Sequence, residues 1–446
     1  MKQPTKSATT KDSSAIAAND TPAPTQHVAT PPDDSPRILV GIDWADGEHV
    51  YVMRDPQGQL HRGTVQQSPE AIAQLLAEWQ RSYPDTRVDV CLETSRGPLI
   101  NALLEHPRVH LYPVNPNALA NYRKAFAHGG GKSDPVDAGL ILQFLESHRE
   151  RLRPLQPNAP LTRELAALCE DRRGLVEQRV KLAQRLTSLL KAYFPAILLM
   201  KPAKIYADFV VRLLLKYPTL AAARAAGRTR LRKLFFATGT KDKIEQRLDV
   251  LLAAMPLSTD EVLLRSSARH ARAICGQLAS LNQSIRAYDR AIEELVAQHQ
   301  DYAVVQALPC GATTKARIIA ALGDDRTRYG SAEELAAATG IAPLTTQSGR
   351  QRHVSSRWAC SKFLRQTFHE FAGLSITKSP WAKAYYQQQQ DRGKSSQMAR
   401  RALAFKWIRI IYRCWQTGES YDEARYVARL QTTQSPLAER LAASKI

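Results

Sequence analysis

The sequence predicts an α/β domain built on a mixed sheet, followed by a long helical region and a mostly helical third domain. Three β-rich runs come first, at 38–44, at 49–54 and after a turn at 55–58, and strands and helices then alternate as far as about residue 150. Three meandering strands followed by strand–helix alternation are typical of a mixed sheet covered by helices. From about residue 160 the apolar periodicity becomes helical, which indicates a domain boundary between the two patterns.

The later elements of the first domain follow from local patterns. Apolar residues at helical spacing, with Trp79 among them, precede a short apolar strand at 88–92 that ends at Glu93. The alternation is completed by a helix at 99–104, a strand at 109–114, a helix from about Pro116 and an apolar helix through Leu145. The first domain is therefore expected over residues 37–150.

Two long amphipathic helices are predicted for the middle of the chain. Apolar residues recur at steps of three and four over 165–194, where Pro195 closes the pattern, and again over roughly 261–298. Charged residues fill the other faces, which favours an antiparallel hairpin or a coiled coil. Such helices serve most often as a scaffold or for dimerisation, and we expect 160–300 to be a helical linker region.

The third domain is expected over 301–415. It opens with a helix, a Pro-Cys-Gly turn and a second helix, and it continues with a loop rich in hydroxyls and arginines before a further helix. Residues 1–36, rich in Ser, Thr, Ala and Pro, are expected to form a disordered tail, and 416–446 a C-terminal tail.

The charge is distributed unevenly along the chain. The 446 residues hold 62 Lys and Arg against 42 Asp and Glu, a net charge of +20, yet residues 1–150 carry 14 basic and 18 acidic side chains. Within 341–413 the balance is 14 basic to 2 acidic, arginine predominates, and aromatic residues are interleaved with it. Such a local excess favours a polyanion, most often nucleic acid, over a role in solubility alone.

Composition also excludes two classes of protein. No stretch approaches the ~20 apolar residues of a membrane span, and the N-terminus lacks the apolar core of a signal peptide. The six cysteines are scattered, without metal-binding spacing, which argues against a zinc site or a disulfide framework. We therefore expect a cytoplasmic protein without a membrane segment.

Four acidic residues stand out in the first domain. Asp43 and Glu93 each end an apolar strand, and Asp134 and Asp137 lie three residues apart near the start of a helix. Each has an ordinary explanation, either as a strand-end acid facing solvent or as a helix cap followed by a capping-box acid. Together, however, four carboxylates can hold hard divalent ions, which clamp the attacking and leaving oxygens of a phosphodiester. The combination indicates a nuclease-like site on a domain of the ribonuclease-H type.

A serine in the basic loop is the remaining candidate. Ser348 lies in the segment TTQSGR and is followed by Arg352 and Arg357. Arginines can hold phosphoryl oxygens while a serine attacks the phosphorus. By spacing alone, a serine in such a loop more often contacts phosphate or forms a turn. From this loop and the helix after it we expect nucleic-acid contacts by Arg350, Arg352, Arg357, Lys362 and Arg365, of which the first three would position the scissile phosphate.

Several short motifs occur in one order along 38–415. They are GIDWA around Asp43, LET at Glu93, KSDPVDA at Asp134 and Asp137, and later ALPCGATTKARIIAALGD, LAAATGIAP and QSG. Together they resemble the DEDD transposases of insertion sequences of the 110 group. The resemblance implies a RuvC-like N-terminal domain, a coiled coil and a C-terminal transposase domain with a catalytic serine.

The resemblance also implies roles for particular residues and partners. Asp43, Glu93, Asp134 and Asp137 would bind Mg²⁺, and Ser348 would join DNA through a phosphoserine. Members of the family are recombinases that excise and insert their element, and they use a bridging non-coding RNA to choose donor and target DNA. They pair the DEDD domain of one protomer with the serine domain of another within a tetramer, so we expect a homo-oligomer, from dimer to tetramer.

Three hypotheses remain open at this point. The first is a Mg²⁺-dependent DNA recombinase guided by RNA. The second is a metal-dependent nuclease, resembling a junction resolvase, that hydrolyses DNA through water and uses Ser348 only as a contact. The third is a nucleic-acid-binding structural protein with a degenerate catalytic domain, which is disfavoured because all four acids and the serine are present. A serine adduct on DNA distinguishes the first from the other two.

Overall fold

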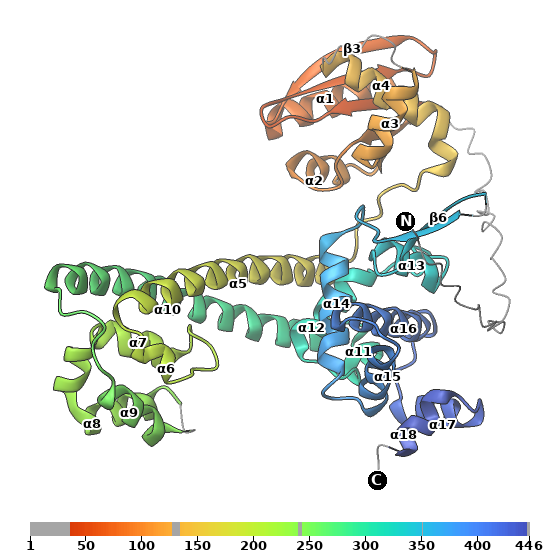
Figure 1. Cartoon of the computed structure of the whole chain (residues 1–446). Helices are drawn as coiled ribbons and strands as arrows, with labels where there is room; N and C mark the ends of the chain where they lie inside the picture. Colours follow the sequence, from red (N-terminus) through yellow and green to blue (C-terminus); the bar gives the residue numbers. More distant parts are fainter. Residues whose placement is uncertain (1–35, 127–133, 240–242, 350, 444–446) are drawn as a thin grey trace, which may run out of the picture. The chain divides into compact units, whose positions relative to one another are not determined.

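The computed structural model describes residues 36–126, 134–239, 243–349 and 351–443. The chain divides into two compact units, with the boundary between Pro157 and Asn158, and each unit is described by itself (Figure 1). The tail expected over 1–36 lies outside the described residues except for its last position.

The first unit contains a five-stranded mixed sheet. Its elements are β1 (Arg37–Asp43), β2 (Glu48–Arg54), β3 (Leu60–Gln66), α1 (Pro69–Ser82), β4 (Arg87–Leu92), α2 (Pro98–Leu104), β5 (Val109–Pro113), α3 (Pro116–Phe126), α4 (Asp134–His148) and the 3-10 helix η1 (Arg149–Arg151). The strand order is β3-β2-β1-β4-β5. β1 pairs antiparallel with β2 and parallel with β4, so the meander and the strand–helix units meet at β1. The predicted α/β domain with a mixed sheet is confirmed.

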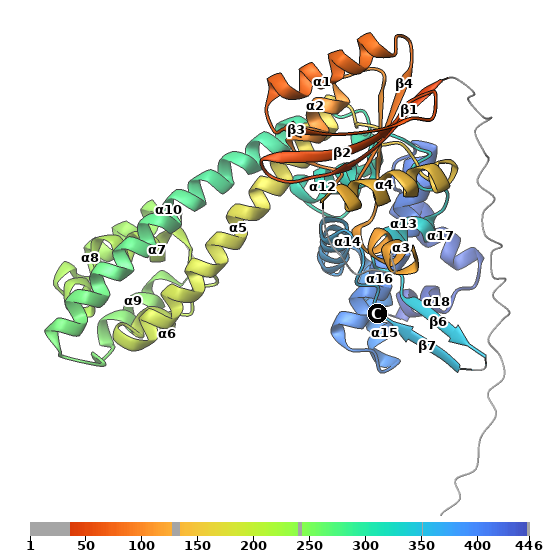
Figure 2. The same cartoon turned by 90° about the horizontal axis from the view of Figure 1, so that it is seen from above.

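Different helices cover the two faces of this sheet (Figure 2). Ile38 and Ile42 of β1 are buried in one core with side chains of α1 and α2. Gly41 faces the other way, beneath Ala138 and Leu142 of α4. An added Cβ at Gly41 would lie 2.4 Å from the carbonyl oxygen of Ala138 and 2.4 Å from the backbone nitrogen of Leu142. Only glycine therefore lets α4 approach the centre of the sheet this closely.

Replacing Gly41 by alanine is expected to lower the free energy of unfolding by about 3 kcal/mol, the upper end of the usual cost of overpacking. The clash is with backbone atoms, so α4 or β1 has to shift. Urea denaturation measures the change. Gly139→Ala is the matched control. Gly139 lies on α4 itself, and nothing lies within 4 Å of a Cβ added there. Alanine is also the better helix former. A Gly41→Ala protein as stable as the wild type would contradict the close contact.

Among its described residues, the second unit is helical except for one two-stranded hairpin. Its elements are α5 (Pro160–Tyr193), α6 (Ala196–Leu199), α7 (Asp208–Lys216), α8 (Leu220–Ala237), α9 (Ile244–Ala253), α10 (Glu261–Gln298), α11 (Tyr302–Gln306), α12 (Ala312–Leu322), α13 (Ala332–Ala338), β6 (Leu344–Ser348), β7 (Gln351–Ser355), α14 (Lys362–Ser375), α15 (Pro380–Asp391), α16 (Ser396–Thr417), α17 (Glu423–Thr432) and α18 (Pro436–Ala443). The mostly helical remainder predicted from the sequence is confirmed.

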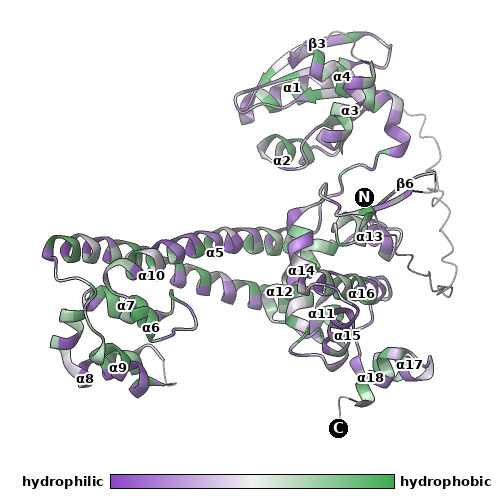
Figure 3. Cartoon of the chain, viewed as in Figure 1, coloured by the Kyte–Doolittle hydropathy of each residue, from purple (hydrophilic) through white to green (hydrophobic). Residues whose placement is uncertain are grey.

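The two longest helices, α5 and α10, lie side by side and run antiparallel (Figure 1). Leu165 near the start of α5 shares a core with Val296 near the end of α10, whereas Leu190 near the end of α5 shares another core with Ile274. Hydrophobic and hydrophilic residues alternate along both helices (Figure 3). The antiparallel packing is thus observed, while a coiled-coil geometry stays a prediction.

The C-terminal core corrects one argument for nucleic-acid binding. Ten Phe, Tyr and Trp residues lie within 341–413, and of these only Trp358 is exposed, at 81%. Trp381 of α15 and Trp407 of α16 are fully buried and pack against each other at the centre of this core. Buried rings cannot stack on bases, so the buried aromatic residues belong to the core, and the argument for nucleic-acid binding depends on the basic charge.

The segment expected as a C-terminal tail over 416–446 contains two helices. Leu430 of α17, together with Leu437 and Leu441 of α18, is buried in the C-terminal core. These leucines recur at roughly helical steps, a pattern that anchors short helices when a neighbouring core offers an apolar surface. The segment is therefore part of the second unit.

Two further features concern the predicted environment of the protein. Within the described ranges, every helix is either too short or too polar to span a membrane. All six cysteines lie in those ranges, and none forms a disulfide.

A buried polar network joins the start of α5 to the end of α10. The ring atom Nε2 of His299 lies 2.7 Å from Oγ1 of Thr162, and this hydroxyl donates to Asp324 at 2.7 Å. His299 Nδ1 accepts from the backbone N–H of Asp301 at 3.0 Å, so the proton of the neutral ring lies on Nε2. Burial lowers the pKa of His299, with Arg326 acting in the same direction and the carboxylates of Asp301 and Asp324 opposing it.

The free energy of unfolding is expected to fall as the pH drops below 6.5, the ordinary pKa of histidine. Below that pH the unfolded chain binds a proton that the folded protein binds only at lower pH, so stability is lost, by at most about 1.4 kcal/mol per pH unit from this group. Urea denaturation between about pH 7.5 and 5.5 measures the slope. His299→Gln should reduce it and the exposed His270→Gln should not; equal slopes in the two variants would contradict the assignment.

Candidate functional site

Asp43 and Glu93 lie at the carboxyl ends of neighbouring parallel strands. Ile42 of β1 pairs with Leu92 of β4, and each acid is the next residue along the chain. Adjacent strands are about 4.8 Å apart, so the register brings the two backbones together at one edge of the sheet. Asp43 is half-buried and Glu93 is exposed. The sheet therefore places two carboxylates at adjacent positions of this edge.

Helix α4 brings Asp134 and Asp137 toward the same edge. Its middle crosses the centre of β1, and near its C-terminal end Glu146 accepts a hydrogen bond from Arg54, which pairs with the opposite end of β1. α4 therefore runs opposite to β1, and its first turn lies toward Asp43. Asp134 is exposed at the first position of the helix, whereas Asp137 is buried at 4% exposure.

Asp137 is paired with a basic side chain. Its Oδ1 lies 2.6 Å from a guanidinium nitrogen of Arg123 on α3, and this buried oxygen accepts no well-formed hydrogen bond. Within the described part of the chain, no three His, Cys, Asp or Glu side chains are grouped to hold a metal ion. Carboxylate oxygens are the ligands that Mg²⁺ prefers. The donor types and their shared edge therefore fit this ion, although the four side chains are not gathered around one point.

Ser348 lies on a β-hairpin where the sequence predicts an irregular loop. β6 pairs antiparallel with β7, and Ser348 at the end of β6 pairs with Gln351 at the start of β7. Gly349, the first residue of the turn, has a φ of 56°, a left-handed conformation that glycine adopts without strain. All of β6 is exposed, including Ser348. The candidate nucleophile is therefore open to solvent at the end of a strand.

The basic residues near Ser348 have different surroundings. Arg350 lies outside the described residues, and Arg352 belongs to β7, although its side chain is not described. Lys362 is exposed at the start of α14, and Arg357 is half-buried. Arg365 donates to the backbone carbonyls of Arg357 and of the residue after it. Lys362 is thus open to an anion, whereas the guanidinium of Arg365 is bonded to the backbone.

Two basic residues with specific contacts do not follow from the sequence pattern. Arg123 contacts Asp137, and Arg401 of α16 donates to the backbone just before β6. The second contact spans 60 positions of the chain. Arginine is abundant in this protein, so no spacing rule singles out either residue.

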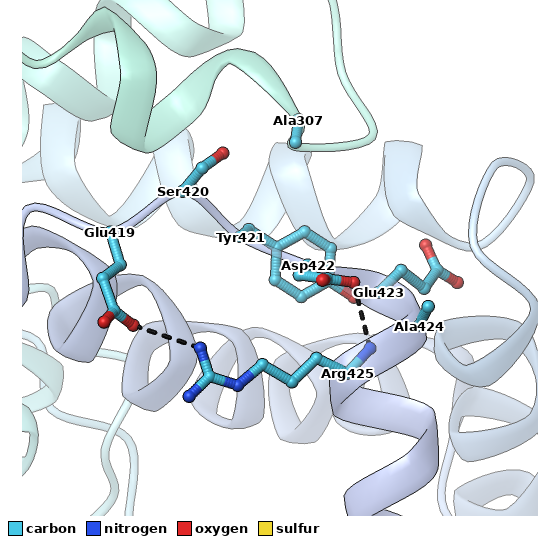
Figure 4. A pocket seen from close by; sticks show the side chains of 8 residues that line it. All are labelled: Ala307, Glu419, Ser420, Tyr421, Asp422, Glu423, Ala424 and Arg425. Atoms are coloured by element: carbon cyan, nitrogen blue, oxygen red, sulfur yellow. Dashed lines mark hydrogen bonds and ion pairs between the residues drawn. The ribbon is translucent and has the colours of Figure 1, made fainter.

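An open hollow of about 700 Å³ lies where α17 begins (Figure 4). Three carboxylates line it, but each has a partner within the chain. Glu419 pairs with Arg425 at 3.4 Å, and Asp422 accepts from the backbone N–H of Arg425 at 3.0 Å. Glu423 accepts from the hydroxyl of Ser379 at 2.9 Å. These contacts fix the start of α17, so the hollow is not a candidate for the catalytic site.

Two family models match the two parts of the chain that carry the candidate residues. A DEDD transposase model matches residues 40–195, which contain all four acids. A model of the IS116/IS110/IS902 transposase family matches residues 305–387, which contain Ser348. The chain belongs to this transposase family. The prediction of a transposase, an enzyme acting on DNA, is confirmed at the level of the family.

Relatives of this transposase match nearly its whole length. A mini-circle protein of Streptomyces coelicolor, named as a transposase for IS117, is 28% identical over 89% of this chain and 98% of its own. A 44.8 kDa protein of insertion element IS116 from Streptomyces clavuligerus is 28% identical over 84% of this chain and 94% of its own. A 42 kDa protein of IS900 from Mycobacterium paratuberculosis is 24% identical over 88% and 98%. Insertion elements are thus the common source of these relatives.

Proposed function

We propose that this transposase cuts and rejoins DNA through a phosphoserine on Ser348, with Mg²⁺ held by Asp43, Glu93, Asp134 and Asp137. The observation that carries the proposal is the exposed serine at the turn of a basic hairpin, within the segment that matches the second family model. A hydroxyl in this position can reach a backbone phosphate without any rearrangement of the core.

The chemistry consists of two transesterifications. Ser348 Oγ bonds to the scissile phosphorus while the bond from that phosphorus to a deoxyribose oxygen breaks, and the hydroxyl proton passes to the leaving oxygen. A deoxyribose hydroxyl of the incoming strand then attacks the phosphoserine, and Ser348 regains its proton. One phosphodiester replaces another, so no external energy source is needed. Arg350, Arg352 and Arg357 would hold the phosphoryl oxygens.

The four acids have a distinct part in this scheme. Asp43 and Glu93 would hold Mg²⁺ from adjacent strand ends, and Asp134 and Asp137 from the first turn of α4. When bound, the ion supplies positive charge to oxygens that become negative during the reaction. The first part of the chain is itself acidic, with 14 basic and 18 acidic residues over 1–150, so a bound cation also reduces its repulsion of DNA.

We further propose that the active site is composite. The acids and Ser348 belong to separate compact units of the chain, which is compatible with one protomer supplying the acids and another the serine in a dimer or tetramer. The domain limits go with this proposal: a RuvC-like domain over 37–150, a coiled coil over 160–300 and a transposase domain over 301–415. The enzyme would act in the cytoplasm with a bridging RNA as guide.

A covalent-trapping assay tests the proposal. The protein is incubated with Mg²⁺, DNA carrying the element's ends and the flanking non-coding RNA, and the products are separated on a denaturing gel. A slow, protease-sensitive DNA band supports the proposal, and its dependence on the RNA tests the guide. Cleaved DNA without an adduct would contradict the phosphoserine intermediate and favour metal-dependent hydrolysis. Bound but uncut DNA would indicate a structural protein.

A further inference from the structure

The hairpin that carries Ser348 is not held by burial of its strands. All five residues of β6 are exposed, and β6 and β7 form a two-stranded sheet by themselves. A hairpin of this kind is only marginally stable in water on its own. Contacts at its base must therefore fix the position of Ser348.

Arg401 of α16 joins the two ends of this hairpin. Its Nε donates to the carbonyl oxygen of Ile341 at 2.9 Å, and one terminal nitrogen donates to that of Gly340 at 2.6 Å, both shortly before β6. The other terminal nitrogen donates to Oγ of Ser356 at 2.9 Å, directly after β7. All three guanidinium nitrogens are used, and the planar fork fixes the two chain segments relative to each other.

The helix that presents Arg401 is firmly anchored. Leu403, half a turn further along α16, is fully buried in the C-terminal core. Burial, with a smaller contribution from Arg365, lowers the pKa of Arg401, yet arginine stays charged at neutral pH. Gly340 packs so tightly that a Cβ there would lie 2.4 Å from Sγ of Cys360. The base of the hairpin is therefore closely fitted to the core.

Arg365 of α14 supports the same base. Its guanidinium donates to the carbonyl oxygens of Arg357 and Trp358 and lies 5.6 Å from the centre of the Trp358 ring. These carbonyls directly follow Ser356, so both arginines hold the chain where it leaves β7. Arg401 donates from three guanidinium nitrogens and Arg365 from one, in each case to protein oxygens, which sets both apart from the exposed Lys362.

We propose that Arg401 is a positioning residue for Ser348, because it ties the chain before β6 to the chain after β7 and so sets where the hydroxyl meets the scissile phosphate. The inference rests on the proposed function of Ser348. A misplacement of reacting groups by about 1 Å costs on the order of 100-fold in rate. Loss of Arg401 should therefore slow adduct formation without weakening DNA binding.

The test compares Arg401→Ala with Arg429→Ala, which removes an exposed arginine of α17 outside the basic segment 341–413. Hydrogen exchange of the β6 and β7 amides should be at least about tenfold faster in Arg401→Ala, with α12 unchanged. The single-turnover rate of adduct formation should fall about 100-fold while the dissociation constant for DNA stays within about twofold. Arg429→Ala should match the wild type in all three measurements.

Two milder variants keep the test valid if Arg401→Ala folds poorly. Ser356→Ala removes one of the three hydrogen bonds, and Arg401→Lys keeps the charge but loses the fork. Both should give effects between the wild type and Arg401→Ala. The double variant Arg401→Ala with Ser356→Ala should be no slower than Arg401→Ala alone, because the two residues share one contact.

Three results would overturn the inference. One is unchanged exchange of the hairpin amides in Arg401→Ala, and another is faster exchange with an unchanged rate of adduct formation. The third is weaker DNA binding with a salt slope reduced by about one, which would make Arg401 a phosphate contact. If the wild type forms no adduct, the proposed function fails by itself, and the exchange measurement still decides whether Arg401 holds the hairpin.

Discussion

Ser348→Ala is expected to abolish the covalent protein–DNA adduct while DNA binding stays within about twofold of the wild type. The variant removes Oγ, the atom through which this side chain can form a phosphoester. Ser348 is exposed on β6, so its removal should not disturb folding. A denaturing gel measures the adduct, and a gel-shift titration measures binding.

The matched control is Ser355→Ala, which removes a hydroxyl from the other end of the same hairpin. Ser355 pairs with Leu344 at the end of the hairpin opposite the turn. We expect a wild-type yield of adduct from this variant. If Ser348→Ala released cleaved DNA at the wild-type rate, Ser348 would be only a contact and a hydrolytic nuclease would be the better description.

The sheet of the first unit could be predicted because its signals are local. The strand that ends at Asp43 and the one that Glu93 follows are short and apolar, and neighbouring parallel strands have their carboxyl ends at the same edge. The approach of α4 to Gly41 could not be predicted in the same way. It depends on a contact between segments about a hundred positions apart, which leaves no periodic trace in the sequence.

The hairpin of β6 and β7 could not be predicted from the sequence, for a different reason. Strands are recognised by alternation between a buried and an exposed face, and β6 has no buried face. The aromatic residues show the opposite difference, because they are more buried than their basic neighbours in the sequence indicate. Trp381 and Trp407 stand among arginines in the sequence, but the helices α15 and α16 turn both rings inward. A charge count cannot distinguish the two faces of a helix.

The sequence predicts which residue types form the candidate site, but it predicts few of the contacts that these residues make. The strand ends and the helix start indicate where the acids lie, because each position follows from local structure. The ion-pair partner of Asp137 does not follow from local structure, because Arg123 is one of many basic residues and belongs to a different helix. The same holds for Arg401, whose hydrogen bonds define the base of the hairpin.

Mg²⁺ is expected to raise the thermal midpoint of the wild-type protein, and Asp137→Asn to lose both that rise and the adduct. A ligand that binds only the folded protein stabilises it by about 1.4 kcal/mol at ten times its dissociation constant. Asp137 is the buried acid of the set, so water cannot replace the lost carboxylate. Without Mg²⁺ the variant should also be less stable than the wild type, because Arg123 loses its anionic partner.

A thermal-shift titration with Mg²⁺ separates these two effects, because the first depends on the ion and the second does not. Asp46→Asn is the control, since it removes an exposed acid three residues beyond Asp43 and should keep the full Mg²⁺-dependent rise. Arg123→Gln keeps all four acids and removes the guanidinium that lies 2.6 Å from Asp137 Oδ1, so less Mg²⁺ should be needed for the half-maximal shift. A wild-type Mg²⁺ response in Asp137→Asn would show that the ion binds away from these carboxylates, whatever the state of the adduct.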